Sequence, residues 1–150
     1  MGIGTSRKAM SDKSTRKAMS EKSKKTLHDD SLSAANSKFA LDLYKLHISS
    51  TDQNVFMSPV SISVALAMTY LGARGQTKSQ MKSVLHFSDV EEDQLHQAFT
   101  DILSALNAPQ KCKVYMANRL FGEKSYTFLE EFLAAGHKHY GAEIAPVDFR

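Results

Sequence analysis

The segment that most constrains the fold of this chain is an apolar run that begins directly after Ser58 and Pro59. Serine is a preferred N-cap, and proline at the first helical position costs no hydrogen bond, so this pair is a strong start signal for a helix. The residues that follow, VSISVALAMTYLGA, place apolar side chains on every side of the predicted helix. Such a helix must be covered on all faces, so we expect it to lie at the centre of a larger core.

An amphipathic helix is predicted ahead of this central segment. Apolar residues recur at steps of three and four, which predicts a helix of about 15 residues behind Ser31 or Ser33 as N-cap. Its apolar face consists of Leu32, Ala35, Phe39, Leu43 and Leu46. Residues 54–57, Asn-Val-Phe-Met, read as a short strand that the following Ser-Pro pair stops.

Two capping boxes predict a third and a fourth helix. Thr77-x-x-Gln80 marks one start, and Asp89-x-x-Glu92 marks the other. The inner face of the fourth helix consists of Leu95, Phe99, Ile102, Leu103 and Leu106. The acidic residues 91–93 would complement the dipole at the first turn of this helix, and we prefer that interpretation to a metal site.

The apolar period changes to two after the fourth helix. Residues 112–121 alternate so that one face is largely apolar, which predicts a strand. A fifth helix is predicted from Phe128 to about Tyr140, and a last short strand over residues 144–149, interrupted by Pro146. The order of four helices, strand, helix and strand predicts an α+β fold without βαβ alternation.

Positive charge is concentrated at the start of the chain. Residues 1–28 hold eight Lys and Arg against two Asp and Glu, a net charge of +6, while the remainder holds eleven against fourteen, a net charge of −3. The first segment contains a nine-residue repeat, TSRKAMSDK then STRKAMSEK, with too few apolar residues to offset its ordering entropy. We expect residues 1–30 to be a disordered basic tail before a folded domain over residues 31–150. The acidic balance of that domain argues against a nucleic-acid partner.

Two modifications of the tail are open hypotheses. The start MGIGTS fits the myristoylation pattern at Gly2, and the basic residues behind it would supply the second signal that a single acyl chain needs at a membrane. Arg-Lys pairs precede Ser11 and Ser20, so phosphorylation there would cancel positive charge and release an electrostatic contact. A solvated tail without either modification is the simpler interpretation.

The sequence contains no catalytic motif. The patterns G-x-S-x-G, H-E-x-x-H, G-x-G-x-x-G and the Walker loop are absent. His137 and His139 are two positions apart on a predicted helix, so their rings diverge, whereas His96 and Asp93 are spaced to form a surface pair. Cys112 lies between two lysines in a predicted strand, where a cysteine is usually an inert small apolar residue. We expect no enzyme activity, catalytic residue, metal ligand or cofactor.

Three segments resemble the serpin family. The run NVFMSPVSISVALAMTYLGARGQTKSQM is similar to the family's segment from a buried strand through helix B into helix C. The runs ANRLF and FLEEFLAAGHKHYGAEIAPVDF are similar to strand 2A, helix E and strand 1A. The signature residues in these segments are Asn54, Pro59, Leu71, Gly72, Gly75 and Thr77. The resemblance covers residues 31–150 and implies a partial serpin domain, namely helices A to E with strands 2A and 1A.

The resemblance also implies structural roles for three polar residues. Ser58 and Ser61 match the family's shutter serines beneath the main sheet, and Asn118 matches an asparagine on the strand above them. Hydroxyl groups at the start of an apolar helix need buried partners, and an asparagine offers both a donor and an acceptor. The alternative is that Ser58 is only an N-cap and Ser61 only a small packing residue.

The family resemblance implies a serine protease inhibitor. In serpins a protease cleaves an exposed reactive-centre loop, which then inserts into the main sheet together with the trapped acyl-enzyme, so the implied partner is a serine or cysteine protease. Serpins are more than twice as long, and no residues here match the hinge or the reactive-centre loop. We therefore expect residues 1–150 to be non-inhibitory alone, as a truncated isoform or an incomplete sequence. The alternative function is a non-inhibitory adaptor that the tail tethers to membranes.

Location and further partners follow from the same sequence features. The start ANSKFALDLYKL is similar to the intracellular, ovalbumin-like branch of the family (clade B) and to its elastase-inhibitor members. The sequence shows neither a secretory signal nor a stretch of about 20 apolar residues, so we expect a cytoplasmic protein, with unconventional release to the extracellular space as the alternative. Residues 89–106 carry five carboxylates and no Lys or Arg, which argues against heparin binding at the fourth helix.

Overall fold

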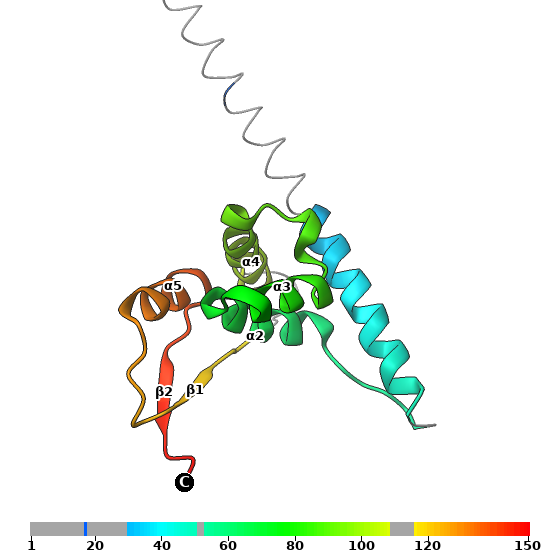
Figure 1. Cartoon of the computed structure of the whole chain (residues 1–150). Coiled ribbons are helices and arrows are strands. Elements are labelled where there is room, and N and C mark those ends of the chain that lie inside the picture. Colours follow the sequence, from blue (N-terminus) through cyan, green and yellow to red (C-terminus); the bar gives the residue numbers. More distant parts are fainter. Residues whose placement is uncertain (1–16, 18–29, 51–52, 109–115) are drawn as a thin grey trace, which may run out of the picture.

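Helices form most of the described structure, and a small sheet lies at one side (Figure 1). The computed structural model describes Lys17 and residues 30–50, 53–108 and 116–150. Residues 30–48 are helical, and the later elements are α2 (Pro59–Gly72), α3 (Gly75–Val84), the 3-10 helix η1 (Phe87–Asp89), α4 (Glu92–Asn107), β1 (Leu120–Glu123), α5 (Glu130–Tyr140) and β2 (Ile144–Val147). The predicted α+β class is confirmed. Almost all of the predicted tail, with Gly2, Ser11 and Ser20, lies outside the described residues.

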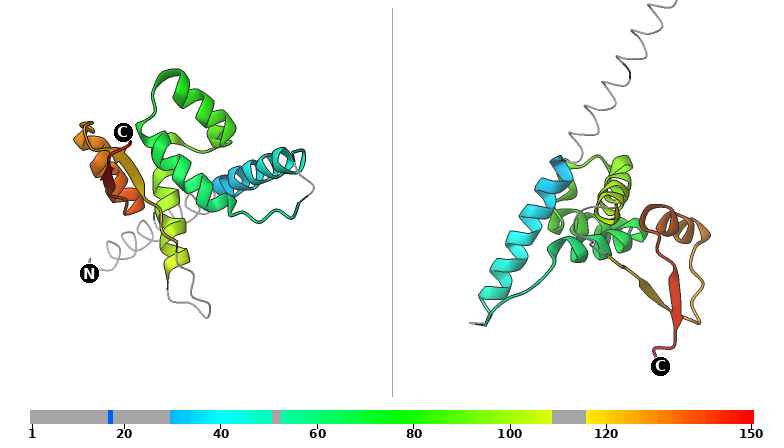
Figure 2. Two further views of the ribbon diagram at one scale, coloured as in Figure 1. Left: turned by 90° about the horizontal axis from the view of Figure 1, so that it is seen from below. Right: turned by 180° about the vertical axis from the view of Figure 1, so that it is seen from behind.

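The helices α2, α3 and α4 lie between the 30–48 helix on one side and the β1–α5–β2 segment on the other (Figures 1 and 2). The main core joins Leu32 and Phe39 of the 30–48 helix to Val64 and Met68 of α2 and Phe99 of α4. On the opposite side, α5 packs against both α2 and α4. The central position of α2 agrees with the expectation from its apolar sequence.

The start of α2 follows the predicted capping pattern. Ser58 has extended backbone angles, and its Oγ accepts a hydrogen bond from the Ser61 backbone N–H at 3.4 Å. Pro59 occupies the first helical turn, where a missing N–H has no cost. The predicted N-cap is therefore confirmed.

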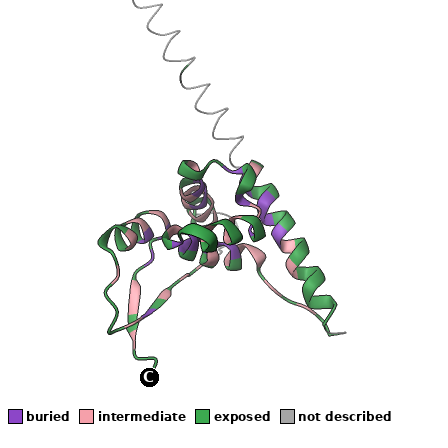
Figure 3. Cartoon of the chain, in the orientation of Figure 1, coloured by how far each residue is buried: buried purple, intermediate pink, exposed green. Residues whose placement is uncertain are grey.

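The burial of α2 is one-sided within the described part of the chain. Its buried residues are Ser63, Val64, Ala67, Met68 and Tyr70. Ile62, Ala65 and Thr69 lie on the other side and are exposed (Figure 3). The prediction that every face of α2 is buried is wrong for these residues. A uniformly apolar sequence indicates that a helix should be buried, but it does not indicate which elements pack against it.

The 30–48 helix differs from its predicted start. It is already helical at Asp30, so Ser31 and Ser33 lie inside it, and the prediction that either is the N-cap is wrong. Leu32, Ala35 and Phe39 are buried in its first half. Its second half is exposed (Figure 3), and Leu46 has 69% of its surface accessible. The apolar face of the 30–48 helix is therefore longer than the part of it that packs against other described elements.

The two capping boxes are also wrong in detail. α3 begins at Gly75 behind Arg74, so Thr77 lies within its first turn. Asp89 belongs to η1, and α4 begins at Glu92 behind Glu91. Neither N-cap uses a side-chain hydrogen bond. Glu92 instead makes long-range contacts, which the short-range pattern did not indicate.

The predicted strand over residues 54–57 is not formed. These residues have no regular secondary structure, and Phe56 is fully exposed. A strand needs a hydrogen-bonded neighbour, and within the described residues the only paired strands are β1 and β2. Local β propensity is therefore insufficient here.

The last three elements form a βαβ unit, which corrects the expectation of no such alternation. β1 and β2 are parallel, with Leu120 opposite Ile144 and Glu123 opposite Val147. α5 makes the connection and ends at Tyr140, and its C-cap is Gly141, whose φ of 59° suits glycine. In the described part of the predicted 112–121 strand, strand structure begins only at Leu120, and residues 112–115, including Cys112, lie outside the described residues.

Gly122 provides a test of this unit. A Cβ at Gly122 would lie 2.6 Å from the Phe128 ring and 2.8 Å from Ile144 Cγ2. We expect Gly122→Ala to lower the free energy of unfolding by about 1–3 kcal/mol through overpacking, measured by urea denaturation. Gly136→Ala is the control, because its nearest neighbour, the Ala142 carbonyl oxygen, is 3.9 Å away. Equal stability of the two variants would contradict this packing.

Candidate functional site

The structure brings two of the three predicted shutter residues together. The Oγ atoms of Ser58 and Ser61 are 2.9 Å apart and form a hydrogen bond. Asn118 lies just before β1 and lines a cavity of about 360 Å³ between α4 and α5. Within the described residues no hydrogen bond joins Asn118 to either serine. The pairing of the serines fits their capping role, and the three-residue shutter stays a prediction.

The predicted signature residues lie in three places. Asn54 is exposed before α2, and Pro59 is in the first turn of α2. Leu71 and Gly72 close α2 and line a groove against α5. The last two, Gly75 and Thr77, belong to the first turn of α3, and Gly75 has a φ of 57°.

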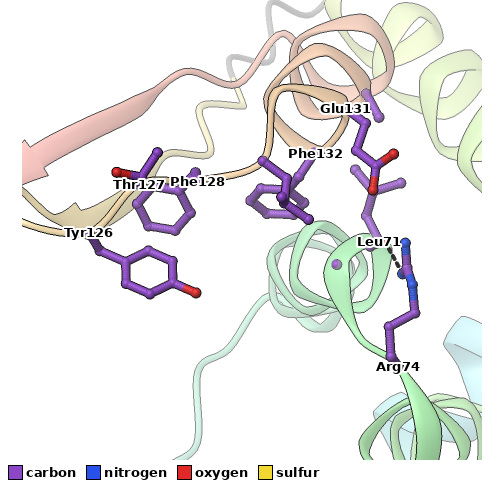
Figure 4. A pocket seen from close by; sticks show the side chains of 10 residues that line it. Leu71, Arg74, Tyr126, Thr127, Phe128, Glu131 and Phe132 are labelled. Atoms are coloured by element: carbon purple, nitrogen blue, oxygen red, sulfur yellow. Dashed lines mark hydrogen bonds between the residues drawn. The ribbon is translucent and has the colours of Figure 1, made fainter.

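This groove, which we call the α2–α5 groove, has a volume of about 640 Å³ (Figure 4). One wall is the end of α2, and the other is the β1–α5 connection with the first turns of α5. A Cβ at Gly72 would lie 3.0 Å from the Phe132 ring, so glycine permits the close approach of this ring to α2. The lining residues are Leu71, Gly72, Arg74, Tyr126, Thr127, Phe128, Leu129, Glu131, Phe132 and Ala135.

A second polar cluster is centred on Glu92 at the start of α4. The buried Tyr70 of α2 donates its hydroxyl hydrogen to Glu92 Oε2 at 2.8 Å. Lys78 and Lys82 of α3 lie 2.6 and 3.4 Å from the two carboxylate oxygens. Burial raises the pKa of Glu92, but hydrogen bonds from Lys78 and Tyr70 outweigh that effect and lower the pKa to about 2. Glu92 therefore ties α2, α3 and α4 together as a carboxylate.

A histidine cluster joins α4 to α5. His96 Nδ1 and the Tyr140 hydroxyl are 2.7 Å apart, and Thr100 Oγ1 donates to the His139 carbonyl oxygen at 3.0 Å. The two imidazole rings have centroids 5.9 Å apart. Burial, with the nearby His139 charge, lowers the pKa of His96 to about 4, and burial also lowers the pKa of His139. Both rings are therefore neutral at pH 7.

These clusters hold helices together. Thr100 Oγ1 also lies 3.3 Å from His139 Nδ1, and its hydroxyl group is within hydrogen-bond distance of the carbonyl oxygens of His96 and His139. The predicted contact of His96 with Asp93 is not formed, because the His96 ring turns to Tyr140 instead. The sequence interpretation missed both clusters. Glu92, His96 and Thr100 are spaced by four residues on α4, which places them on one face and was the available signal.

Two kinds of site are not found in the described part of the chain. The described residues contain no group of three or more His, Cys, Asp or Glu side chains that could hold a metal ion. No helix among them is long and apolar enough to cross a membrane.

The arrangement is that of an α+β domain whose polar clusters support its helices. The family model for serpins, described as serine protease inhibitor, matches residues 34–150. This chain belongs to the serpin family.

The relatives agree with the branch that the sequence resembles. Leukocyte elastase inhibitor from Sus scrofa is 50% identical over 125 residues, and that from Bos taurus is 51% identical over 124 residues. Each alignment covers 80% of this chain and 32% of the relative. The chain thus spans about a third of the length of the curated relatives it matches.

The structural comparison gives the same result. Human thyroxine-binding globulin superposes with a TM-score of 0.72 and 32% sequence identity, and the match covers 83% of this chain and 34% of that chain. The described helices and the small sheet are therefore arranged as in part of a serpin.

The His96 environment predicts a pH dependence of stability. The His96 pKa falls from 6.5 to about 4 on folding, so the unfolded chain binds a proton in this interval while the folded chain does not. The contribution of His96 to the free energy of unfolding is fully present above pH 6.5 and is lost as the pH falls toward 4. We expect His96→Gln to remove about 1 kcal/mol of the stability difference between pH 7 and pH 5, after allowance for partial exposure.

This prediction is measured by urea denaturation across the same pH range. His47→Gln, at an exposed position of the 30–48 helix, is the control and should retain the wild-type slope. An unchanged slope in His96→Gln would contradict the assignment.

Proposed function

We propose that this chain supplies the N-terminal third of an intracellular serine protease inhibitor. The observation that carries the proposal is 50% identity to a leukocyte elastase inhibitor across 80% of the chain. The parallel β1–β2 pair and the adjoining helices are the parts of the inhibitor that this chain supplies. The partner is a serine or cysteine protease, and the protein acts in the cytoplasm, with release from cells as an alternative.

Inhibition in this family uses loop insertion, and the β1–β2 pair belongs to the receiving sheet. Within the described residues β1 has β2 on one edge and no strand on the other. An unpaired edge carries free backbone donors and acceptors, which a further strand satisfies. Residues 1–150 hold no match to the reactive-centre loop, so we expect them to be non-inhibitory by themselves.

The shutter residues and the tail complete the proposal. We assign Ser58, Ser61 and Asn118 to the support of the sheet where it opens, on the basis of their family positions and the 2.9 Å contact of the two serines. The acidic first turn of α4, with Glu92 and Asp93, gives no support to heparin binding. The basic repeat before residue 30 gives no support to specific nucleic-acid recognition, because it lacks interleaved aromatic residues.

A chimera tests the proposed function. Residues 31–150 replace the matching segment of the Sus scrofa leukocyte elastase inhibitor, which supplies the reactive-centre loop. We expect the chimera to form a complex with leukocyte elastase that survives denaturing electrophoresis, because this segment is competent to receive the loop. Residues 1–150 alone should form no such complex.

The parent inhibitor is the positive control for complex formation. Circular dichroism and resistance to a non-target protease show whether the chimera is folded. A folded chimera that elastase cleaves without a covalent complex would contradict the proposal.

A membrane-tethered adaptor is the second candidate function, favoured by the start MGIGTS and the basic repeat. If Gly2 is myristoylated, Gly2→Ala should move the protein from the membrane fraction of cell lysates to the soluble fraction, by about tenfold or more. Glutamate at both Ser11 and Ser20 should weaken membrane contact in the same direction by reducing positive charge. Unchanged partitioning of Gly2→Ala would discard the lipid anchor.

A further inference from the structure

The α2–α5 groove carries a row of three aromatic rings. Tyr126 and Phe128 of the β1–α5 connection are packed edge to face with centroids 5.0 Å apart, and Phe128 and Phe132 are stacked at 6.3 Å. The rings follow one another along the groove, which Figure 4 shows. Tyr126 and Leu129 are each 67% exposed, so this apolar wall is accessible. A planar ring is the ligand group that extends such a row.

Two opposite charges lie at one end of this row. Figure 4 shows Arg74 and Glu131 beyond Phe132, on the two sides of Leu71. Neither residue forms an ion pair within the described part of the chain, either with the other or with a third residue. Arg74 and Glu131 therefore line the same groove without forming an ion pair with each other.

The position of Arg74 leaves one edge of its guanidinium group available. Nη1 donates to the carbonyl oxygens of Leu71 at 3.1 Å and Ala73 at 2.9 Å, which fixes the group at the end of α2. Nε and Nη2 remain, and these two parallel donors match the two oxygens of a carboxylate. Glu131 has a neighbour, Glu130, that also complements the α5 dipole but does not line the groove.

We propose that the α2–α5 groove binds a small aromatic zwitterion of the chemical class of the free aromatic amino acids. The ligand ring extends the row at Phe128 and Phe132, the carboxylate pairs with Arg74, and the ammonium group pairs with Glu131. An aromatic anion would be repelled by Glu131, and an aromatic cation by Arg74. A zwitterion offers a partner to both residues, because its carboxylate and its ammonium group are bonded to the same carbon and carry opposite charges. This site is independent of the proposed protease inhibition.

Tryptophan is a suitable probe because the chain itself contains none. The emission and anisotropy of free L-tryptophan are followed as the purified chain, residues 1–150, is added. We expect a saturable blue shift and a rise in anisotropy as the indole ring enters the groove. Arg74→Gln and Glu131→Gln should each weaken binding by about tenfold, because each removes one charge-assisted contact.

The chain offers matched control variants. Glu130→Gln changes the adjacent carboxylate outside the groove, and Arg119→Gln changes an exposed arginine before β1. Both should retain the wild-type affinity within about twofold. The substitutions are surface charge-to-amide changes, and far-UV circular dichroism of all four variants should coincide with the wild type.

Two ligand analogues assign each charge to its partner. Tryptamine lacks the carboxylate, so Glu131→Gln should weaken its binding, whereas Arg74→Gln should strengthen its binding by removing a repulsive charge. Indole-3-propionate lacks the ammonium group and should show the opposite pattern. Absence of saturable binding up to the solubility limit of tryptophan would overturn the proposal. Equal losses in the control variants, or the same response of both analogues to both substitutions, would also overturn it.

Discussion

The described structure depends on the packing of other helices against one face of α2. Tyr70 shows how this contact works, because its ring packs edge to face on Phe87 at 5.6 Å while its hydroxyl reaches Glu92. A buried tyrosine contributes apolar area only if its hydroxyl finds a partner, and the start of α4 provides a charged one. Burial and hydrogen bonding therefore select the same relative position of α2 and α4. The 30–48 helix and α5 then pack on the two sides of this pair.

The polar groups near α4 have different electrostatic tasks. Glu92 is charged, since two lysines and a tyrosine hydroxyl surround its oxygens, whereas His96 one turn later is neutral because it is buried beside His139. A single helix face thus carries a charged contact to α2 and α3 and an uncharged contact to α5. This division lets the helix join three neighbours without placing an unpaired charge in the interior.

Sequence reasoning found what depends on local chemistry. Ser58 and Pro59 start α2 as expected because capping involves residues three apart. The family resemblance is confirmed by the family model, which matches residues 34–150, and by the relatives. The sequence predictions failed where contacts between residues far apart in the chain determine the structure. Residues 54–57 have strand propensity but no paired neighbour in the described residues, and Glu92 fits a capping box but bonds Tyr70. The sequence indicated only one wall of the α2–α5 groove, because Leu71 and Gly72 were identified as signature residues but the aromatic residues opposite them were not.

The parallel pairing of β1 with β2 has a consequence for folding order. Leu120 and its partner Ile144 are separated by only 24 positions, and α5 spans nearly half of this interval, so the contact order of the unit is low for a parallel sheet. Because the chain is synthesised from its N-terminus, both partners of this register are available once Val147 has left the ribosome. The β1–α5–β2 unit therefore establishes its pairing through contacts within residues 120–147 alone.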